Sequence, residues 1–241
     1  MLLEATGVSK AFGAFRAVAG ADLLVEEGEI VGLIGPNGAG KSTFFNCLAG
    51  ETAPTTGRIV FRGEDVTHAP PERHARAGIG RTFQVPTAFE DMTVLNNVMV
   101  GAFLRHPHRN DAREHARRIV ELTGLRSDQN ARSLGTPGRK RLEIARVLAT
   151  DPKLLLLDES LAGLTPTEMQ EAIALVRRIH AMGITIVIVE HIMEVIMTLT
   201  RRLLVFNQGR VIASGSPDEV VRDDAVIEAY LGRAHRRPRE N

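Results

Sequence analysis

Residues 35–42 read Gly-Pro-Asn-Gly-Ala-Gly-Lys-Ser, a complete G-x-x-x-x-G-K-S phosphate-binding loop. Glycines at these positions let consecutive backbone N–H groups turn toward phosphate oxygens. The spacing assigns Lys41 to the β- and γ-phosphates and the Ser42 hydroxyl to Mg²⁺. The apolar run at 29–34 predicts a strand before the loop, and 43–49 predicts a helix whose positive end faces the anion. The stretch therefore predicts a nucleoside-triphosphate site.

The composition limits the class of protein. The 241 residues carry a formal net charge of only +1, so nucleic acid is not an expected partner. The single cysteine, Cys47, excludes an internal disulfide and suits a reducing compartment. We find no apolar run of the roughly 18 residues that a membrane-spanning helix needs, and no signal-peptide pattern at the N-terminus. We expect a cytosolic protein that reaches a membrane only through a partner.

Hydrophobic patterns divide the chain into regions. Alternation between residues 3 and 23 predicts antiparallel strands, whereas the apolar runs 154–157 and 184–189 predict buried strands that alternate with helices. Short helical patterns dominate from about 86 to 134. We expect an α/β fold with a mostly parallel core sheet, an antiparallel β subdomain and a helical insert. Residues 1–85 and 135–241 would form the nucleotide-binding core, and 86–134 the helical subdomain.

Two acids close the leucine run at 154–157. The carboxyl end of a strand is where ligands of α/β proteins bind, so Asp158 is expected to hold Mg²⁺ and Glu159 to take the proton of an attacking water. His191 ends the next predicted strand and is placed to reach the terminal phosphate. Phe12 is a candidate for stacking on a base, although the sequence equally allows it to be a core residue.

The order and spacing of these motifs resemble the ATPase subunits of ABC transporters over essentially the whole chain. The phosphate loop, the Gln84 of Arg-Thr-Phe-Gln at 81–84, the acid pair and His191 carry the resemblance. The stretches 92–94, 141–146, 162–164, 189–191 and 228–232 are similar to the first of the two ATPase types of branched-chain amino-acid importers. The resemblance implies a P-loop NTPase of ABC ATPase type, with a single such domain over residues 1–241.

The resemblance also implies a role for each motif residue. Glu159 would be the catalytic base and His191 the γ-phosphate switch. Phe12 would stack on adenine, and Ser42 and Gln84 would ligate Mg²⁺ with Asp158 behind them. The ATP phosphates would lie on Gly35, Pro36, Asn37, Gly38, Ala39, Gly40, Lys41, Ser42 and Thr43, with Gln84 beside them.

The implied activity is ATP hydrolysis, with ATP and Mg²⁺ bound, that energises an importer of branched-chain or related amino acids. The implied partners are a second related ATPase subunit, identical or different, the transmembrane permease subunits and an extracytoplasmic substrate-binding protein. The chain would lie at the cytoplasmic face of the cell membrane. The insert at 86–134 would dock on the membrane partner and respond to ATP through Gln84.

One stretch departs from the family pattern. ABC ATPases typically carry Leu-Ser-Gly-Gly-Gln before the helix that ends in Ala-Arg, and this chain has Leu134, Gly135, Thr136, Pro137 and Gly138 there. Gly135 lacks the hydroxyl and Pro137 the N–H that would contact the γ-phosphate, a loss of about 3–6 kcal/mol. Ser133 or Thr136 offers an alternative hydroxyl, or the register shifts by one residue. Smaller departures are Ser160 in place of Pro, and Thr165 in place of Asp or Asn.

The signature of one ABC ATPase covers the ATP that its partner holds. The resemblance therefore predicts an asymmetric pair of sites. The site on this chain's own loop would hydrolyse ATP, while the site beneath its signature would be weak.

Three other functions remain open. A soluble ABC-type ATPase acting on DNA or ribosomes usually adds a coiled coil or a second cassette, and the chain shows neither, nor an internal repeat. A small-molecule kinase would need an arginine-rich lid, but the arginines at 105–118 fit a solvated helix face better. An ABC exporter ATPase, such as that for lipopolysaccharide, is disfavoured by the residues around Leu142 and Tyr230.

Overall fold

The computed structural model describes residues 1–83 and 87–231. The chain forms two compact units, Met1–Pro70 with Val187–Asn241 and Pro71–Ile186. Gln84 and the basic tail after residue 231 lie outside the described residues. Among the helices of the described ranges, none has the length and apolar character that crossing a lipid bilayer requires.

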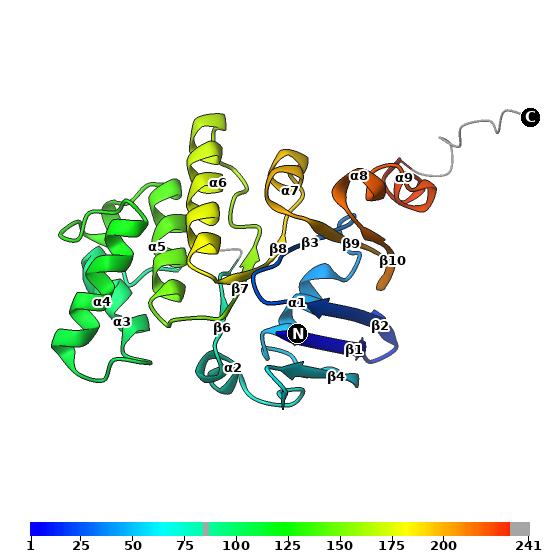
Figure 1. Ribbon diagram of the computed structural model, residues 1–241, viewed down its shortest axis with the longest axis horizontal. Helices are drawn as coiled ribbons and strands as arrows, with labels where there is room; N and C mark the ends of the chain where they lie inside the picture. Colours follow the sequence, from blue (N-terminus) through cyan, green and yellow to red (C-terminus); the bar gives the residue numbers. More distant parts are fainter. Residues whose placement is uncertain (84–86, 232–241) are drawn as a thin grey trace, which may run out of the picture. The chain divides into compact units, whose positions relative to one another are not determined.

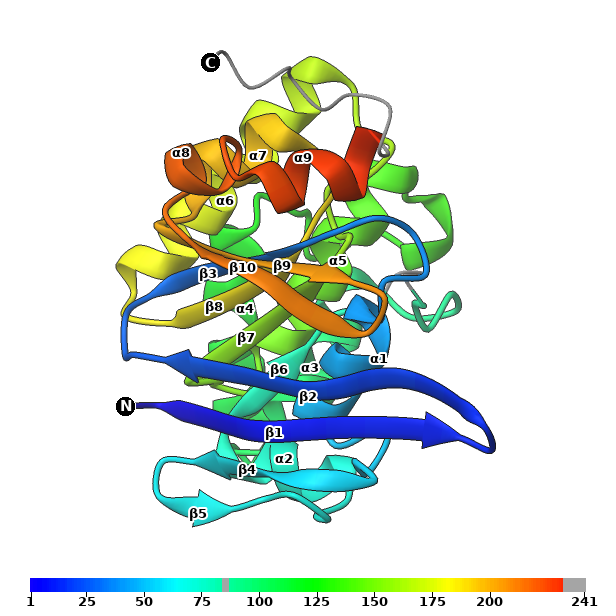
Figure 2. The ribbon, with the colours of Figure 1, turned by 90° about the vertical axis from the view of Figure 1, so that its right-hand side faces the viewer.

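An antiparallel sheet forms one layer of the first unit (Figure 2). Its strands run in the order β2-β1-β4-β5, with bounds Phe15–Val25, Leu3–Phe12, Thr56–Phe61 and Glu64–Asp65. Along β1 the buried Leu3 and Ala5 alternate with the exposed Glu4 and Thr6, which is the pattern of a strand with one covered face. The predicted antiparallel subdomain is confirmed.

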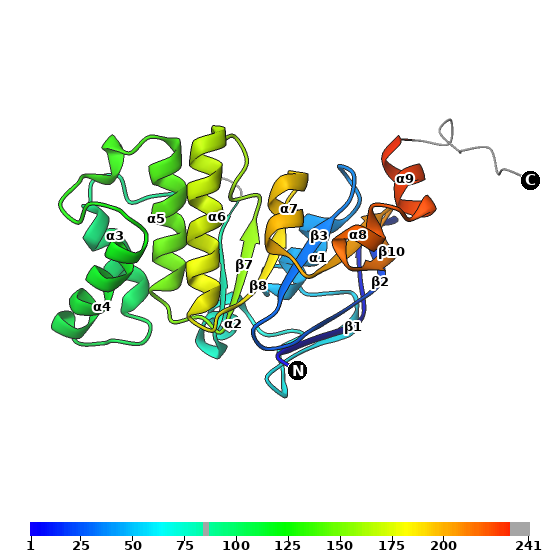
Figure 3. The ribbon, with the colours of Figure 1, turned by 45° about the horizontal axis from the view of Figure 1, so that its top comes forward.

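The first unit also carries the strand that leads into the phosphate loop. β3 (Ile30–Ile34) pairs in parallel with β9 (Arg202–Asn207), which pairs antiparallel with β10 (Arg210–Gly215). Helix α1 (Lys41–Leu48) follows the loop, and its Phe44 ring packs 5.2 Å from the ring of Phe206 on β9. Cys47 of α1 is buried, and burial raises the pKa of its thiol to about 11. The unit ends with the helices α7 (Met193–Leu199), α8 (Pro217–Val220) and α9 (Asp224–Leu231), of which α8 and α9 pack against β10 (Figure 3).

The second unit combines a short parallel pair of strands with helices (Figure 1). β6 (Ile79–Arg81) pairs in parallel with β7 (Leu154–Asp158), and all five residues of β7 are buried. β8 (Thr185–Val189) begins in this unit and ends in the first. The helices are α2 (Pro71–Ala77), α3 (Val94–Ala102), α4 (Arg109–Leu122), α5 (Thr136–Leu148) and α6 (Pro166–Ala181), with a 3₁₀ turn at Ala131–Ser133.

Helix packing in the second unit supports the predicted helical insert. α3 packs against both α4 and α5, and α5 runs beside α6 in Figures 1 and 3. Helix α5 begins at Thr136, before Pro137 and not after it. The reason is that a proline is well accommodated in the first helical turn, where its missing N–H has no intrahelical partner to lose. The mixture of parallel and antiparallel sheets confirms the expected fold class.

Candidate nucleotide site

The phosphate loop lies between β3 and α1, and two of its glycines are required by close backbone approaches. Gly35 and Gly40 have φ values of 146° and 101°. A Cβ at Gly35 would lie 2.2 Å from the carbonyl oxygen of Phe206, and one at Gly40 would lie 2.3 Å from that of Ala17. No other residue fits these positions, so the shape of the loop is set by the strands behind it.

The start of α1 is suited to bind an anion. Gly40 is the N-cap, and within the described ranges no side chain caps this end and no acid lies in the first turn. The first N–H groups of a helix have no intrahelical acceptor, and they carry the positive end of its dipole. The buried Lys41 adds a cation, with its Nζ donating to the carbonyls of Gly35 at 2.7 Å and Pro36 at 3.0 Å. Ser42 is exposed at this helix start, which fits the predicted contact with Mg²⁺.

Two further predicted residues lie in the same unit. Phe12, at the end of β1, is 53% exposed, with the Lys10 ammonium 5.1 Å from its ring centroid. This exposure rules out the core reading of Phe12. His191 follows the end of β8 and is also exposed, whereas the preceding Glu190 is buried. Both side chains are therefore accessible to a ligand.

The acid pair lies in the second unit, at the carboxyl end of β7. Asp158 is buried, and its Oδ2 accepts a hydrogen bond from Arg81 Nη2 on β6 at 2.8 Å. Glu159 adopts a left-handed backbone conformation with φ of 46°, which is uncommon for a residue other than glycine. Unusual backbone angles of this kind need support from surrounding contacts.

A pair of hydroxyl groups supplies part of that support. Thr82 is fully buried after β6, and its Oγ1 accepts the N–H of Asp158 at 3.1 Å. The same Oγ1 lies 2.7 Å from the hydroxyl of Ser160, which is also buried. The residues on both sides of Glu159 are thus attached to one threonine. Lys140 of α5 adds a further tie, because its Nζ donates to the carbonyl of Ala162 at 2.5 Å.

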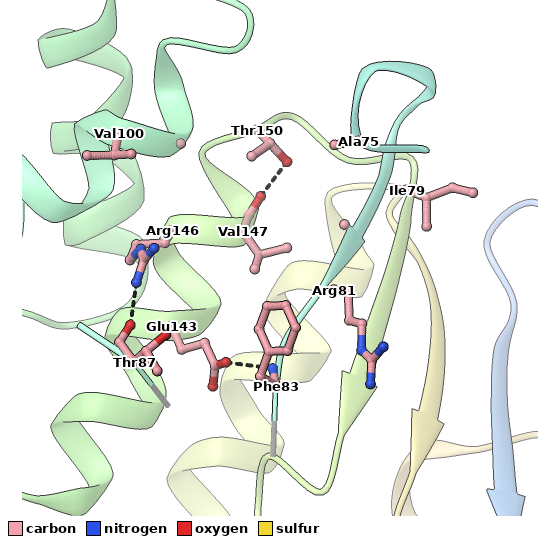
Figure 4. A pocket seen from close by; sticks show the side chains of 12 residues that line it. Ala75, Ile79, Arg81, Phe83, Thr87, Val100, Glu143, Arg146, Val147 and Thr150 are labelled. Atoms are coloured by element: carbon pink, nitrogen blue, oxygen red, sulfur yellow. Dashed lines mark hydrogen bonds between the residues drawn. The ribbon is translucent and has the colours of Figure 1, made fainter. Parts of the chain in front are cut away.

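Helix α5 also holds the chain on both sides of Gln84 (Figure 4). The Phe83 N–H donates to Glu143 Oε1 at 2.6 Å, and Arg146 donates to the carbonyl of Thr87. Burial raises the pKa of Glu143, and the bond from Phe83 opposes this effect. α5 therefore holds Phe83 and Thr87, the described residues that flank the predicted Gln84.

The divergent signature forms the start of α5. Gly135 is the N-cap, Thr136 and Pro137 begin the helix, and in the part of the chain that is described no acid or side-chain cap lies there. A Cβ at Gly138 would lie 2.9 Å from Leu134 Cδ2, so this glycine is closely packed. Any other residue at position 137 would carry a backbone N–H that points out of the first helical turn and has no intrahelical acceptor. Proline here is neutral for the fold, and it leaves this helix start with one N–H donor fewer.

The predicted residues fall into two groups. The first unit holds Phe12, the loop and His191, and the second holds Asp158, Glu159 and the signature. The sequence predicts no individual role for five further residues beside these groups: Arg81, Thr82, Lys140, Glu143 and Arg146. Their only signal was their position beside Gln84, the acid pair or the signature.

Comparison with known proteins agrees with these features. The family described as "ABC transporter" matches residues 18–162, and the family described as "Branched-chain amino acid ATP-binding cassette transporter" matches 210–236. The chain is 38% identical to the high-affinity branched-chain amino acid transport ATP-binding protein BraF of Pseudomonas aeruginosa, over 97% of this chain and 98% of that protein. It is 39% identical, with the same coverage, to LivG of Escherichia coli (strain K12), which has the same description.

Two further similarities bear on fold and function. The lipopolysaccharide export system ATP-binding protein LptB of Acidithiobacillus ferridurans is 36% identical over 96% of this chain and 97% of its own length. Among solved structures, a nucleotide-free ATP-binding cassette from an ABC transporter superposes with a TM-score of 0.88 at 32% identity, covering 96% of this chain and 99% of that chain.

Proposed function

We propose that ATP hydrolysis by this chain, which belongs to the ATP-binding subunits of ABC transporters, drives the import of branched-chain or related amino acids. The observation that carries the choice of cargo is the match of residues 210–236 to the branched-chain amino acid cassette family. The similarity to an export ATPase at 36% identity keeps lipopolysaccharide export as the second candidate.

ATP would lie on the loop Gly35–Thr43, with its adenine against Phe12. The uncapped start of α1, the buried Lys41 and the exposed Ser42 support this placement. Ser42 and Gln84 would hold Mg²⁺ with Asp158 behind them, and the ion would neutralise developing phosphate charge. Glu159 would accept the proton of the attacking water, and His191 would contact the γ-phosphate.

The partner of this chain in the nucleotide sandwich would be a second ATPase subunit. The start of α5 would cover the partner's ATP, and it offers fewer donors because of Gly135 and Pro137. We therefore propose that hydrolysis occurs mainly on this chain's own loop. The substrate-binding protein of the transporter would select the cargo on the outer side of the membrane, with this chain at the cytoplasmic face.

The surface beside Phe83 and Thr87 would receive the permease. A cavity of about 250 Å³ opens there, between α2, β6, α3 and α5 (Figure 4). At its margin Phe83 is 48% and Val100 is 43% exposed, and Phe89 and Phe103 are exposed nearby. Exposed apolar side chains around a hollow are typical of a protein-binding surface. A permease segment seated there would press directly on the chain that α5 holds.

Transport by the reconstituted complex tests this proposal. Proteoliposomes would contain the permease, both ATPases and the substrate-binding protein, with labelled leucine as the probe. We expect ATP-dependent uptake together with release of free phosphate, and neither with Glu159→Gln. Phosphate release without uptake of any amino acid would reject the import proposal, and a phosphorylated small molecule would point to a kinase.

A further inference from the structure

A cluster of two histidines and one aspartate lies in the second unit and contains none of the residues assigned to the nucleotide site. His106 follows α3, His115 lies on α4 and Asp151 follows α5. Asp151 Oδ2 lies 3.1 Å from His106 Nε2, and Asp151 Oδ1 lies 3.3 Å from His115 Nε2. The two imidazole rings are 4.5 Å apart between centroids. One potential ligand atom from each residue falls within 4.8 Å of the others.

His115 is the buried member of the cluster. It is 9% exposed, and its Nε2 makes no hydrogen bond within the described residues. Burial lowers the pKa of His115, and the Asp151 carboxylate and a hydrogen bond with the Ala149 backbone oppose this effect. A backbone bond on one ring nitrogen leaves the other nitrogen for a ligand, which is the usual arrangement of a metal-binding histidine.

The chemistry of these donors favours one class of ion. With the other ring nitrogen of His115 donating to the Ala149 backbone, its Nε2 presents a lone pair to Asp151 Oδ1 at 3.3 Å, and a cation between these two atoms would remove their repulsion. Two nitrogens and one carboxylate suit Zn²⁺ and related transition metals, whereas Mg²⁺ and Ca²⁺ prefer oxygen ligands. Three protein ligands leave a fourth tetrahedral position for water. The side chain of His106 is 29% exposed, which leaves the site open to solvent.

We propose that His106, His115 and Asp151 bind a divalent transition-metal ion of the zinc class. The ion would link α4 to two other segments, the one that follows α3 and the one that follows α5. It would therefore stiffen the helical part of the second unit without touching the nucleotide residues. The exposed Arg118 lies close enough to disfavour positive charge at His115, so it would weaken the affinity for the ion.

Metal titration of the full-length protein tests the proposal. After treatment with a chelator, the chain is titrated with Co²⁺ in excess Mg²⁺, and the bound Co²⁺ is then displaced by Zn²⁺. We expect one ion per chain, with the visible absorption of tetrahedral Co²⁺ and a higher melting temperature in Zn²⁺. His106→Gln and His115→Gln should each weaken binding by more than about tenfold.

Two variants serve as controls. His108→Gln removes an exposed histidine from the same segment and should leave the affinity unchanged. Arg118→Met should tighten binding. Failure of Co²⁺ to bind, or equal binding by wild type and His106→Gln, would overturn the proposal. The proposal would also be overturned if His106→Gln changed only the pH dependence of stability and left metal binding unchanged, because the cluster would then hold a proton. Should His115→Gln not fold, His106→Gln, at the more exposed of the two positions, still gives the answer.

Discussion

Replacing Thr82 by valine should destabilise the protein and disturb the acid pair. Valine has nearly the same shape as threonine, so the change removes the hydroxyl and little else. In the structure this hydroxyl accepts the N–H of Asp158 at 3.1 Å and lies 2.7 Å from the Ser160 hydroxyl. All three residues are buried, so water does not readily replace the lost partner.

The expected magnitude follows from the two groups that lose this partner. A buried donor or acceptor left unsatisfied costs about 1–3 kcal/mol. Two such groups, the Asp158 N–H and the Ser160 hydroxyl, give about 2–6 kcal/mol. Thr82 keeps its backbone bond to the Leu156 carbonyl, so the strand pairing itself survives. A loss in this range is a large part of the roughly 5–15 kcal/mol that stabilises a folded domain.

Urea unfolding followed by circular dichroism measures the effect. Thr82→Val should lower the unfolding midpoint, and Ser160→Ala should lower it less, because only one partner is removed. The control is Thr167→Val, an exposed position on α6, which should change the free energy of unfolding by no more than about 0.5 kcal/mol. If Thr82→Val behaved like this control, the hydroxyl pair would not support the acid pair and our reasoning would be wrong.

Three further predictions concern the site. Glu159→Gln should reduce phosphate release at least about 100-fold while nucleotide binding persists, because only the base is lost, and unchanged turnover would contradict the role of Glu159. The same change in the partner ATPase should be less damaging. Gly40→Ala should destabilise the protein by about 1–3 kcal/mol and weaken ATP binding, because the new Cβ meets the Ala17 carbonyl at a φ of 101°; thermal melts and nucleotide titration measure both effects. Burial raises the pKa of Glu143, so the folded state binds a proton at this carboxyl group more readily than the unfolded state does. The stability that Glu143 contributes therefore falls as the pH rises through the folded pKa. Glu143→Gln keeps an acceptor for Phe83, so its stability relative to wild type should rise as the pH increases from about 4.3, the pKa of glutamate in an unfolded chain, through the raised pKa of the folded state, and a pH-independent difference in urea midpoint would refute this.

The amino-acid sequence by itself determined the features that local patterns carry. The phosphate loop could be predicted because the residues that would face a phosphate, from Gly35 to Ser42, follow one another in a G-x-x-x-x-G-K-S pattern. The leucine run before Asp158 predicted a buried strand, and the alternation around Leu3 predicted an antiparallel sheet. In each case the physical requirement and the residues that meet it are neighbours in the chain.

Only the tertiary structure decided the contacts between residues far apart in the sequence. Thr82 reaches Ser160 because β6 pairs with β7, and that pairing also brings Arg81 to Asp158. The grouping of His106 with Asp151 depends on how α3, α4 and α5 pack. The pattern of apolar and polar residues indicates which face of a helix or strand is buried, but not which element covers that face. Contacts between elements that pack together can therefore not be predicted from the local sequence.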